Sequence, residues 1–219
     1  MNKLSDLVSR ISAALASVFT FVALYAIFIV VPPEQKMGII QKIFYFHVPA
    51  AWISFLSFGV VFVASILYLW KQEERYDQLA HASGEIGLVF CTLVLITGPI
   101  WGRPVWGVWW TWDSRLTTTL VLWLIYVAYL MVRAYGGNRG PRYGAVLGIV
   151  GFLDVPIVYF SIRWWRTIHP PPVTLAPSMV VTLLISLVAF TLLYLCLLLQ
   201  RVAQERMKDE IDWLKRQER

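Results

Sequence analysis

The chain has 219 residues, of which 58% are apolar, with a formal net charge of +6 and a mean hydropathy of +0.65. Soluble domains average roughly 45–50% apolar residues, so this composition excludes an ordinary soluble domain and indicates an integral membrane protein. Cys91 and Cys196 stand singly in apolar runs and offer no disulfide framework, CxxC pair or CxxCH attachment site. The sequence contains no GxxxxGKS or GxxxxGKT loop, so any nucleotide-driven step requires another chain.

Six apolar runs are long enough to cross about 30 Å of hydrocarbon at about 1.5 Å per residue. The first follows Lys3 and Arg10, as a signal peptide would, but it ends in Val-Val-Pro-Pro without a small-residue cleavage site, which favours a retained helix. The expected fold is all-α, with a six-helix transmembrane bundle over residues 1–200 and a charged cytoplasmic tail over 201–219. The runs are 11–31, 49–70, 84–100, 116–132, 144–162 and 176–199.

The distribution of Lys and Arg predicts the orientation in the membrane. With the N-terminus inside, the inner segments hold thirteen of these residues and the outer loops hold six. Cytoplasmic loops carry the excess of positive charge, so both termini are expected in the cytoplasm. The inner residues are Lys3, Arg10, Lys71, Arg75, Arg133, Arg139, Arg142, Arg201, Arg206, Lys208, Lys215, Arg216 and Arg219, and the outer residues are Lys36, Lys42, Arg103, Arg115, Arg163 and Arg166.

The connections before the second and third runs carry two of the three histidines. Apolar residues recur at helical spacing in EQKMGIIQKIFYF, residues 34–46, which predicts a short interfacial helix. It delivers the chain to His47 at the outer mouth of the second helix, where Pro49 suits a first turn. His81 is expected in a charged inner loop, and Glu85 is expected to open the third helix near headgroups or water.

The stretch WGRPVWGVWWTWDSRLTTT, residues 101–119, is too rich in Gly, Pro and charge for another membrane helix. We expect it to form a Trp-rich loop at the outer surface, with indole rings toward lipid or ligand and N–H groups toward water. An interfacial belt accounts for Trp52, Trp70 and Trp123. Five tryptophans within twelve residues exceed what a belt requires.

Two features leave alternatives open. Asp154 lies near the middle of the fifth run, two residues before Pro156. A proline there removes a helical hydrogen bond, and an intramembrane Asp normally faces the bundle interior or a wet cavity, so a kink with a packing role and a ligand-lining role both fit. The tail has a narrow apolar stripe that fits either a solvated helix or a docking site for a partner.

Alternation of the loops places His47, the Trp-rich loop and the RWWRTIHPPPV loop with His169 on the outer face, whereas His81 lies on the inner face. Haem suits this combination, because its iron takes one or two neutral imidazoles, its ring packs on aromatic surfaces and its propionates bind arginines. Arginines are also unexpected on an outer face. A single histidine at the end of a helix more often has a structural role than a metal-binding one. The haem interpretation therefore depends on two histidines, His47 and His169, being expected on the same face.

The run WGRPVWGVWWTWDSRLT resembles the WWD signature of the haem-handling superfamily of cytochrome c maturation, and FYFHVPAAW and YFSIRWWRTIHP narrow the resemblance to the CcmC family. The resemblance covers residues 10–200. It implies non-covalent haem b on the periplasmic side of a bacterial inner membrane, with His47 and His169 as axial ligands. The Pro-rich sequence after His169 departs from the family pattern.

The resemblance further implies that the WWD loop presents haem to the periplasmic chaperone CcmE and that the chain associates with CcmA, CcmB and CcmD. No enzymatic activity is expected. The four arginines of the outer loops are expected to contact the propionates or the partner. The residues expected to bind the cofactor are Trp101, Arg103, Trp106, Trp109, Trp110, Trp112, Asp113, Arg115, Arg163, Trp164, Trp165 and Arg166.

Three other functions are alternatives to haem binding at the outer face. A haem translocator would need an inner binding site, and the inner side offers only His81. A redox enzyme with transmembrane haem b would need histidines in the middle of facing helices, and none of the six runs has one there. A structural assembly subunit would need no haem. Haem could reach the outer site from the lipid or from CcmB.

Overall fold

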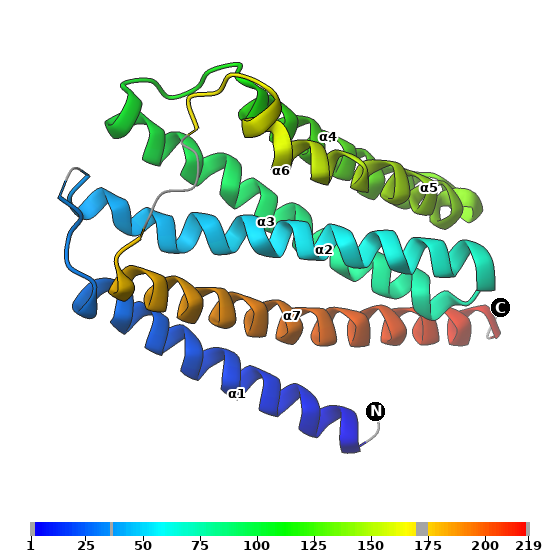
Figure 1. The fold of residues 1–219 in the computed structure, drawn as a ribbon. Helices are drawn as coiled ribbons and strands as arrows, with labels where there is room; N and C mark the ends of the chain where they lie inside the picture. Colours follow the sequence, from blue (N-terminus) through cyan, green and yellow to red (C-terminus); the bar gives the residue numbers. More distant parts are fainter. Residues whose placement is uncertain (1–2, 36, 170–174, 218–219) are drawn as a thin grey trace.

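The computed structural model describes residues 3–35, 37–169 and 175–217, and regular structure in these ranges is helical (Figure 1). Within these described ranges, six helical segments are long and apolar enough to cross a membrane, which confirms the six predicted runs. The elements are α1 (Lys3–Tyr25), the π-helix η1 (Ala26–Val30), the 3₁₀ helix η2 (Ile39–Ile43), α2 (Phe44–Lys71), α3 (Glu74–Trp106), α4 (Ser114–Tyr135), the 3₁₀ helix η3 (Gly137–Arg139), α5 (Gly140–Phe152), α6 (Asp154–Trp164) and α7 (Pro177–Gln217).

The helices run up and down, with α2 and α3 in the middle, α1 and α7 on one side, and α4, α5 and α6 on the other (Figure 1). The start of α1 and the end of α7 lie at the same end of the bundle, here called the terminal end. The connection between α3 and α4 lies at the opposite end, here called the loop end. The two ends of the described chain therefore lie together, and their position on the cytoplasmic side of a membrane stays a prediction.

A layer of aromatic rings from α2 and α4 lies in the core of the bundle. Phe58 and Tyr126 stack with ring centroids 3.6 Å apart and planes 14° from parallel, and both side chains are buried. Gly84 of α3 makes room for this layer, because a Cβ there would lie 2.7 Å from Cε1 of Tyr129. Helices in lipid associate through close packing rather than through exclusion of water, so small residues at such contacts fix the arrangement.

Charged pairs tie the helices together at the terminal end. Arg133 of α4 donates to both carboxylate oxygens of Asp77 in α3, at 2.5 and 2.7 Å. Arg201 of α7 donates to Glu85 of α3 at 2.5 and 3.0 Å, and its Nη2 lies 2.5 Å from Oε1 of Glu205. Residues 201–217 of the predicted tail are thus the continuation of α7. Arg201, at the start of the tail, anchors it to α3 through Glu85.

The expected start of the third helix was wrong by about three turns. The helix begins at Glu74, so His81 lies within it and not in a loop, and Glu85 pairs with Arg201 rather than with headgroups. Glu74 and Asp77 occupy the first turn, where negative charge complements the helix dipole, so this polar stretch is a good helix start despite its low hydropathy.

The fifth membrane crossing is two helices joined at Leu153. The predicted disturbance near Pro156 is confirmed, but it falls at Leu153, one turn before the proline, because Pro156 has no N–H to bond to the carbonyl of Phe152. Asp154 is the first residue of α6. α5 packs against both α2 and α4, whereas α6 packs mainly against α4.

The Trp-rich loop is shorter than the predicted range 101–119. α3 continues to Trp106 and α4 begins at Ser114, so residues 107–113 form the connection. Gly107 ends α3 with φ of 79° and donates its N–H to the carbonyl of Arg103 at 3.0 Å. Pro99 and Pro104 lie inside α3 without ending it.

The interfacial helix predicted over 34–46 is also shorter than expected. It is the 3₁₀ helix η2, and α2 follows it directly from Phe44. Pro49 therefore lies in the second turn of α2 and not in the first, whereas His47 lies in the first turn.

Candidate haem site

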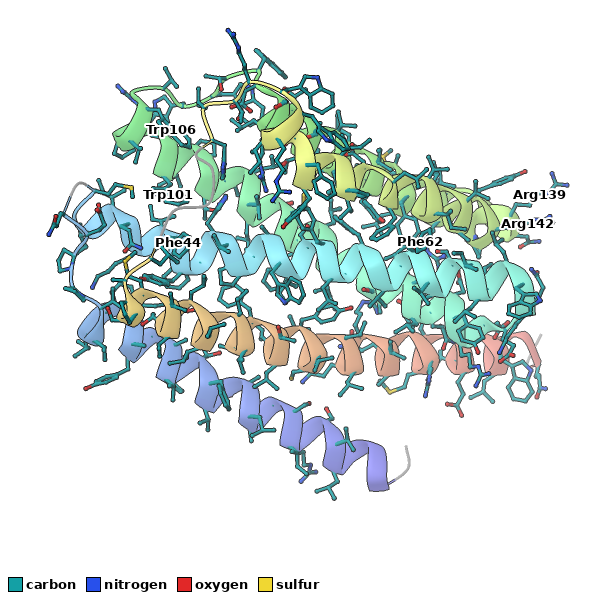
Figure 2. The ribbon with its side chains drawn as sticks, in the orientation of Figure 1. Phe44, Phe62, Trp101, Trp106, Arg139 and Arg142 are labelled. Carbon is teal, nitrogen blue, oxygen red and sulfur yellow. The ribbon has the colours of Figure 1, made fainter. Side chains whose placement is uncertain are left out.

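A cavity of about 300 Å³ opens at the loop end, between α2, α3, α4 and α6 and beneath the connections 107–113 and 165–169. Its lining is mainly apolar, as is usual for small-molecule sites. Trp101 and Trp106 mark this end of α3, and Arg139 and Arg142 mark the opposite end of the bundle (Figure 2). Of the fourteen predicted site residues, the cavity is lined by His47, Trp101, Trp106, Trp109, Trp110, Arg115 and His169.

His47 reaches the cavity from the first turn of α2. Its Nδ1 lies 2.8 Å from Oγ1 of Thr97 in α3. Its ring packs edge to face against Trp101, with centroids 5.8 Å apart and planes at 64°. Trp101 also packs edge to face against Phe44, at 6.0 Å between centroids. The imidazole is thus positioned by α3, although it belongs to α2.

His169 reaches the same cavity from the connection after α6. Its ring centroid lies 6.4 Å from that of Trp106, with planes at 51°. Its backbone N–H bonds to Oγ1 of Thr167 at 3.1 Å, and the N–H of Ile168 bonds to Oδ2 of Asp113 at 3.3 Å. The bond from Ile168 to Asp113 therefore holds this connection against the Trp-rich loop. His169 and His47, which are far apart in the sequence, line the same cavity.

The five tryptophans between residues 101 and 112, two at the end of α3 and three in the loop, differ in exposure and position. Trp101, Trp106, Trp109 and Trp110 line the cavity, whereas Trp112 does not. The side chains of Trp109 and Trp112 are 61% and 76% exposed. Trp112 packs edge to face on Trp110, with centroids 5.6 Å apart. The Nε1 atoms of Trp101 and Trp110 are buried and have no hydrogen-bond partner among the described residues.

The predicted arginines are not equivalent. Arg115, at the start of α4, lines the cavity. Nη1 of Arg103 donates to the backbone carbonyl of Gly107 at 2.5 Å and so stabilises the end of α3. Arg163 and Arg166 are exposed and lie outside the cavity lining. Arg115 is thus the arginine best placed to meet an anionic group of a ligand.

The remaining predicted residues lie beside the cavity. Asp113 caps the N-terminus of α4 by accepting from the N–H of Leu116 at 3.0 Å. Trp164 and Trp165 are 58% and 52% exposed and pack edge to face, with centroids 5.8 Å apart. These indoles enlarge the aromatic surface at the loop end and do not line the cavity.

Asp154 does not line the cavity, so the first of its two interpretations, a packing role at the break in the fifth crossing, fits its position better. The sequence did not single out several residues of the cavity wall, because they are ordinary helix residues without a motif. They include Ser54 and Phe55 of α2, Cys91 of α3, Thr119 of α4 and Tyr159 of α6. Only their convergence in three dimensions identifies them.

Within the described ranges, no group of three or more His, Cys, Asp or Glu side chains is arranged to hold a bare metal ion. Two imidazoles in an apolar, aromatic cavity instead suit a metal that brings most of its own ligands. Haem iron is such a metal, because the macrocycle supplies four nitrogens and the protein supplies the axial positions. Arg115 adds donors for the anionic edge of such a ligand. The residues present therefore fit haem.

Comparison with known proteins gives an independent result. The family model described as CcmC, Heme exporter protein C, matches residues 1–217. The Heme exporter protein C of Bradyrhizobium diazoefficiens is 38% identical over 189 residues, which cover 82% of this chain and 72% of that protein. The protein of the same name from Haemophilus influenzae is 31% identical over 224 residues, covering 94% and 91% of the two chains. A putative cytochrome c biosynthesis ccmC-like mitochondrial protein of Marchantia polymorpha is 34% identical over 152 residues, covering 69% and 65%.

Proposed function

This chain belongs to the Heme exporter protein C family of cytochrome c biogenesis, and on that premise we propose that it binds haem b non-covalently at the loop end, with His47 and His169 as the axial ligands. The observation that carries the proposal is that these two histidines, one in the first turn of α2 and one in the connection after α6, line one cavity. The family is that of a haem exporter subunit and not of a known catalytic enzyme.

The cavity walls support the proposed orientation of the ligand. Haem supplies an iron that accepts neutral imidazole nitrogens at its two axial positions. The indoles of Trp101 and Trp106 each contact one of the two histidines, so they pack beside the expected axial ligands. Arg115 is the proposed propionate contact, and Arg103, Arg163 and Arg166 are proposed to meet the outer propionate edge or a partner.

The exposed indoles at the loop end support presentation of haem to another protein. Trp109, Trp112, Trp164 and Trp165 are more than half exposed. Large exposed aromatic groups are typical anchors of protein interfaces. We therefore propose that the haem chaperone CcmE docks on this surface and receives haem there, in a complex that also contains CcmA, CcmB and CcmD.

The proposed location is the inner membrane of a bacterium, with the loop end in the periplasm and both termini in the cytoplasm. The excess of Lys and Arg on the segments of the terminal end supports this orientation. A translocator with a second, inner haem site is disfavoured, because the ring nitrogens of His81 lie 3.5 Å from the carboxylates of Glu85 and Glu205.

The visible spectrum of the purified protein after haem supply tests the proposal. The wild-type protein should show a Soret band, and replacement of both His47 and His169 by Ala should abolish it. His81→Ala, which removes the remaining histidine of the chain, is the matched control and should leave the band unchanged. Glycine variants of the two ligands should regain part of the haem when free imidazole is added, because imidazole fills the vacated axial position.

Two outcomes would contradict the proposal. A Soret band of wild-type intensity in the double variant would remove the ligand assignment. A wild-type protein that takes up no haem would favour the structural assembly subunit instead.

A further inference from the structure

Three positions of α3 hold the His47 ring. Oγ1 of Thr97 lies 2.8 Å from Nδ1. Gly98 leaves space for the ring edge, since a Cβ at this glycine would lie 3.5 Å from Cε1 of His47. The indole of Trp101, one turn beyond Thr97, packs edge to face with the imidazole. Of these three contacts from α3, only the one with Thr97 is a hydrogen bond, so it is the one that can select which ring nitrogen carries the proton.

The direction of this hydrogen bond follows from a second one. Oγ1 of Thr97 donates to the backbone carbonyl of Leu93 at 2.7 Å, and a carbonyl oxygen can only accept. The hydroxyl has one proton, which this bond uses, so the oxygen can only accept from His47. Nδ1 of His47 therefore carries the proton. In a neutral imidazole the lone pair then resides on Nε2.

We propose that Thr97 is a positioning residue for the iron ligand: its hydroxyl accepts the Nδ1 proton of His47, fixes the ring in place and leaves the Nε2 lone pair for the metal. This inference rests on the proposed function for its role toward iron. A metal-bound histidine almost always donates its other N–H to a fixed acceptor, which orients the ring and raises its basicity. Thr97 is the acceptor that this chain provides.

The same helix offers a matched control. Oγ1 of Thr92 donates to the carbonyl of Leu88 at 2.8 Å and accepts from Nε1 of Trp123 at 2.8 Å. It repeats the arrangement of Thr97 but serves an indole in place of a histidine. Thr92→Val and Thr97→Val each remove one such hydroxyl from α3 at nearly constant side-chain volume. Any difference in haem binding or in the His47 proton between the two variants is therefore due to the lost bond to His47 and not to the loss of a helix hydroxyl.

The first measurement uses haem-free protein with ¹⁵N-labelled histidine. Nitrogen NMR separates a protonated from an unprotonated ring nitrogen, and the resonances of His47 are assigned by their loss in His47→Ala. His47 should carry its proton on Nδ1 in the wild type, in Thr97→Ser and in Thr92→Val. In Thr97→Val, Nε2–H should become populated. A wild-type protein with its proton on Nε2, or no change in Thr97→Val, would overturn the inference without bearing on haem binding.

The second measurement uses haem-loaded protein. Loss of a hydrogen-bond acceptor behind a metal ligand typically lowers metal affinity about 10- to 100-fold, and Thr97→Val should lower haem affinity by this order. The less basic ligand should also raise the midpoint potential of the haem. Thr97→Ser should restore both quantities, and Thr92→Val should leave both unchanged.

The two measurements separate the possible failures. Unchanged affinity and potential in Thr97→Val, despite a change of tautomer, would show that Thr97 does not position an iron ligand. A wild-type protein that takes up no haem would overturn the proposed function and the role toward iron, while the NMR result would still decide the proton position.

Discussion

Oδ2 of Asp113 accepts a hydrogen bond at 3.3 Å from the backbone N–H of Ile168, the residue directly before His169. The other carboxylate oxygen accepts from the N–H of Leu116 at 3.0 Å and so begins α4. One side chain therefore starts a helix and fastens the connection that carries His169. Asp113 does not line the cavity, so its structural role is to hold a proposed ligand in place.

The two roles of Asp113 can be separated by substitution. Asp113→Ser keeps an N-cap oxygen but is too short to bridge to Ile168, whereas Asp113→Ala removes both bonds. A solvent-exposed hydrogen bond contributes about 0.5–1.5 kcal/mol, so both variants should lose roughly two- to tenfold in haem affinity. Only Asp113→Ala should also lose the cap, worth about 1 kcal/mol of stability. Haem titration and thermal unfolding measure the two effects, and full affinity in Asp113→Ser would exclude the fastening role.

The Arg133–Asp77 pair should be a major contributor to stability at the terminal end. Its side chains are only 9% and 16% exposed. Arg133→Ala leaves a buried, unpaired carboxylate, and such a loss costs about 3–5 kcal/mol. Arg75→Ala is the control, because its pair with Glu73 is 59% and 43% exposed and should be worth at most about 1 kcal/mol. Thermal unfolding in detergent compares the two, and equal shifts in Tm would contradict this ranking.

Cysteine labelling tests the orientation. Arg139 lies at the terminal end (Figure 2), and Val105, 40% exposed, lies near the end of α3 at the loop end. Single cysteines at these positions, with Cys91 and Cys196 replaced by Ala, should react with membrane-impermeant reagents from opposite sides of the membrane. Val105→Cys should react from the periplasm. Reaction of both positions from the same side would contradict the topology.

Trp109 and Trp110 should make different contacts, one with the partner protein and the other with the ligand. Adjacent indoles cannot easily present the same face to one planar ligand, and Trp109 is 61% exposed, whereas Nε1 of Trp110 is buried. Replacement of both by Ala should leave detectable haem on His47 and His169 but reduce covalent haem on co-expressed CcmE. Trp70→Ala, at an exposed indole near the end of α2, should change neither quantity.

The comparison that decides this prediction is the haem content of the purified membrane protein beside haem-stained chaperone from the same cells. A proportional fall of both in the double Trp variant would show that the pair is simply part of the binding pocket.

The sequence predicted the crossings well, because hydropathy reports burial in lipid directly. It located helix ends less well. The extension of α3 to Trp106 across Pro99 and Pro104 shows that a composition rich in Gly and Pro does not by itself end a membrane helix. The polar first turns of α3 were missed for the opposite reason, because they lie beyond the apolar window and are stabilised by charge pairs such as Arg133 with Asp77.

For the site, alternation of loops was sufficient to place His47 and His169 at one end, and the cavity brings them together as expected. Loop alternation could not distinguish the role of Arg115, which lines the cavity, from that of Arg103, which donates to the carbonyl of Gly107 at the end of its own helix. That distinction depends on the direction of each side chain. Thr97 carried no signal in the sequence, because a threonine that bonds to the carbonyl four residues earlier is common in membrane helices.

The break at Leu153 has a consequence for how this molecule can vary. In an unbroken helix, an insertion or deletion rotates every residue beyond it by about 100° per position, since a turn contains about 3.6 residues. The face of α5 that packs on α2 and the wall of the cavity that α6 provides would then share one register. At Leu153 the N–H bonds to the carbonyl of Val150 at 3.1 Å, so the regular hydrogen bonding of the helix changes there. A one-residue insertion or deletion should therefore be tolerated better at Leu153 than inside α5 or α6.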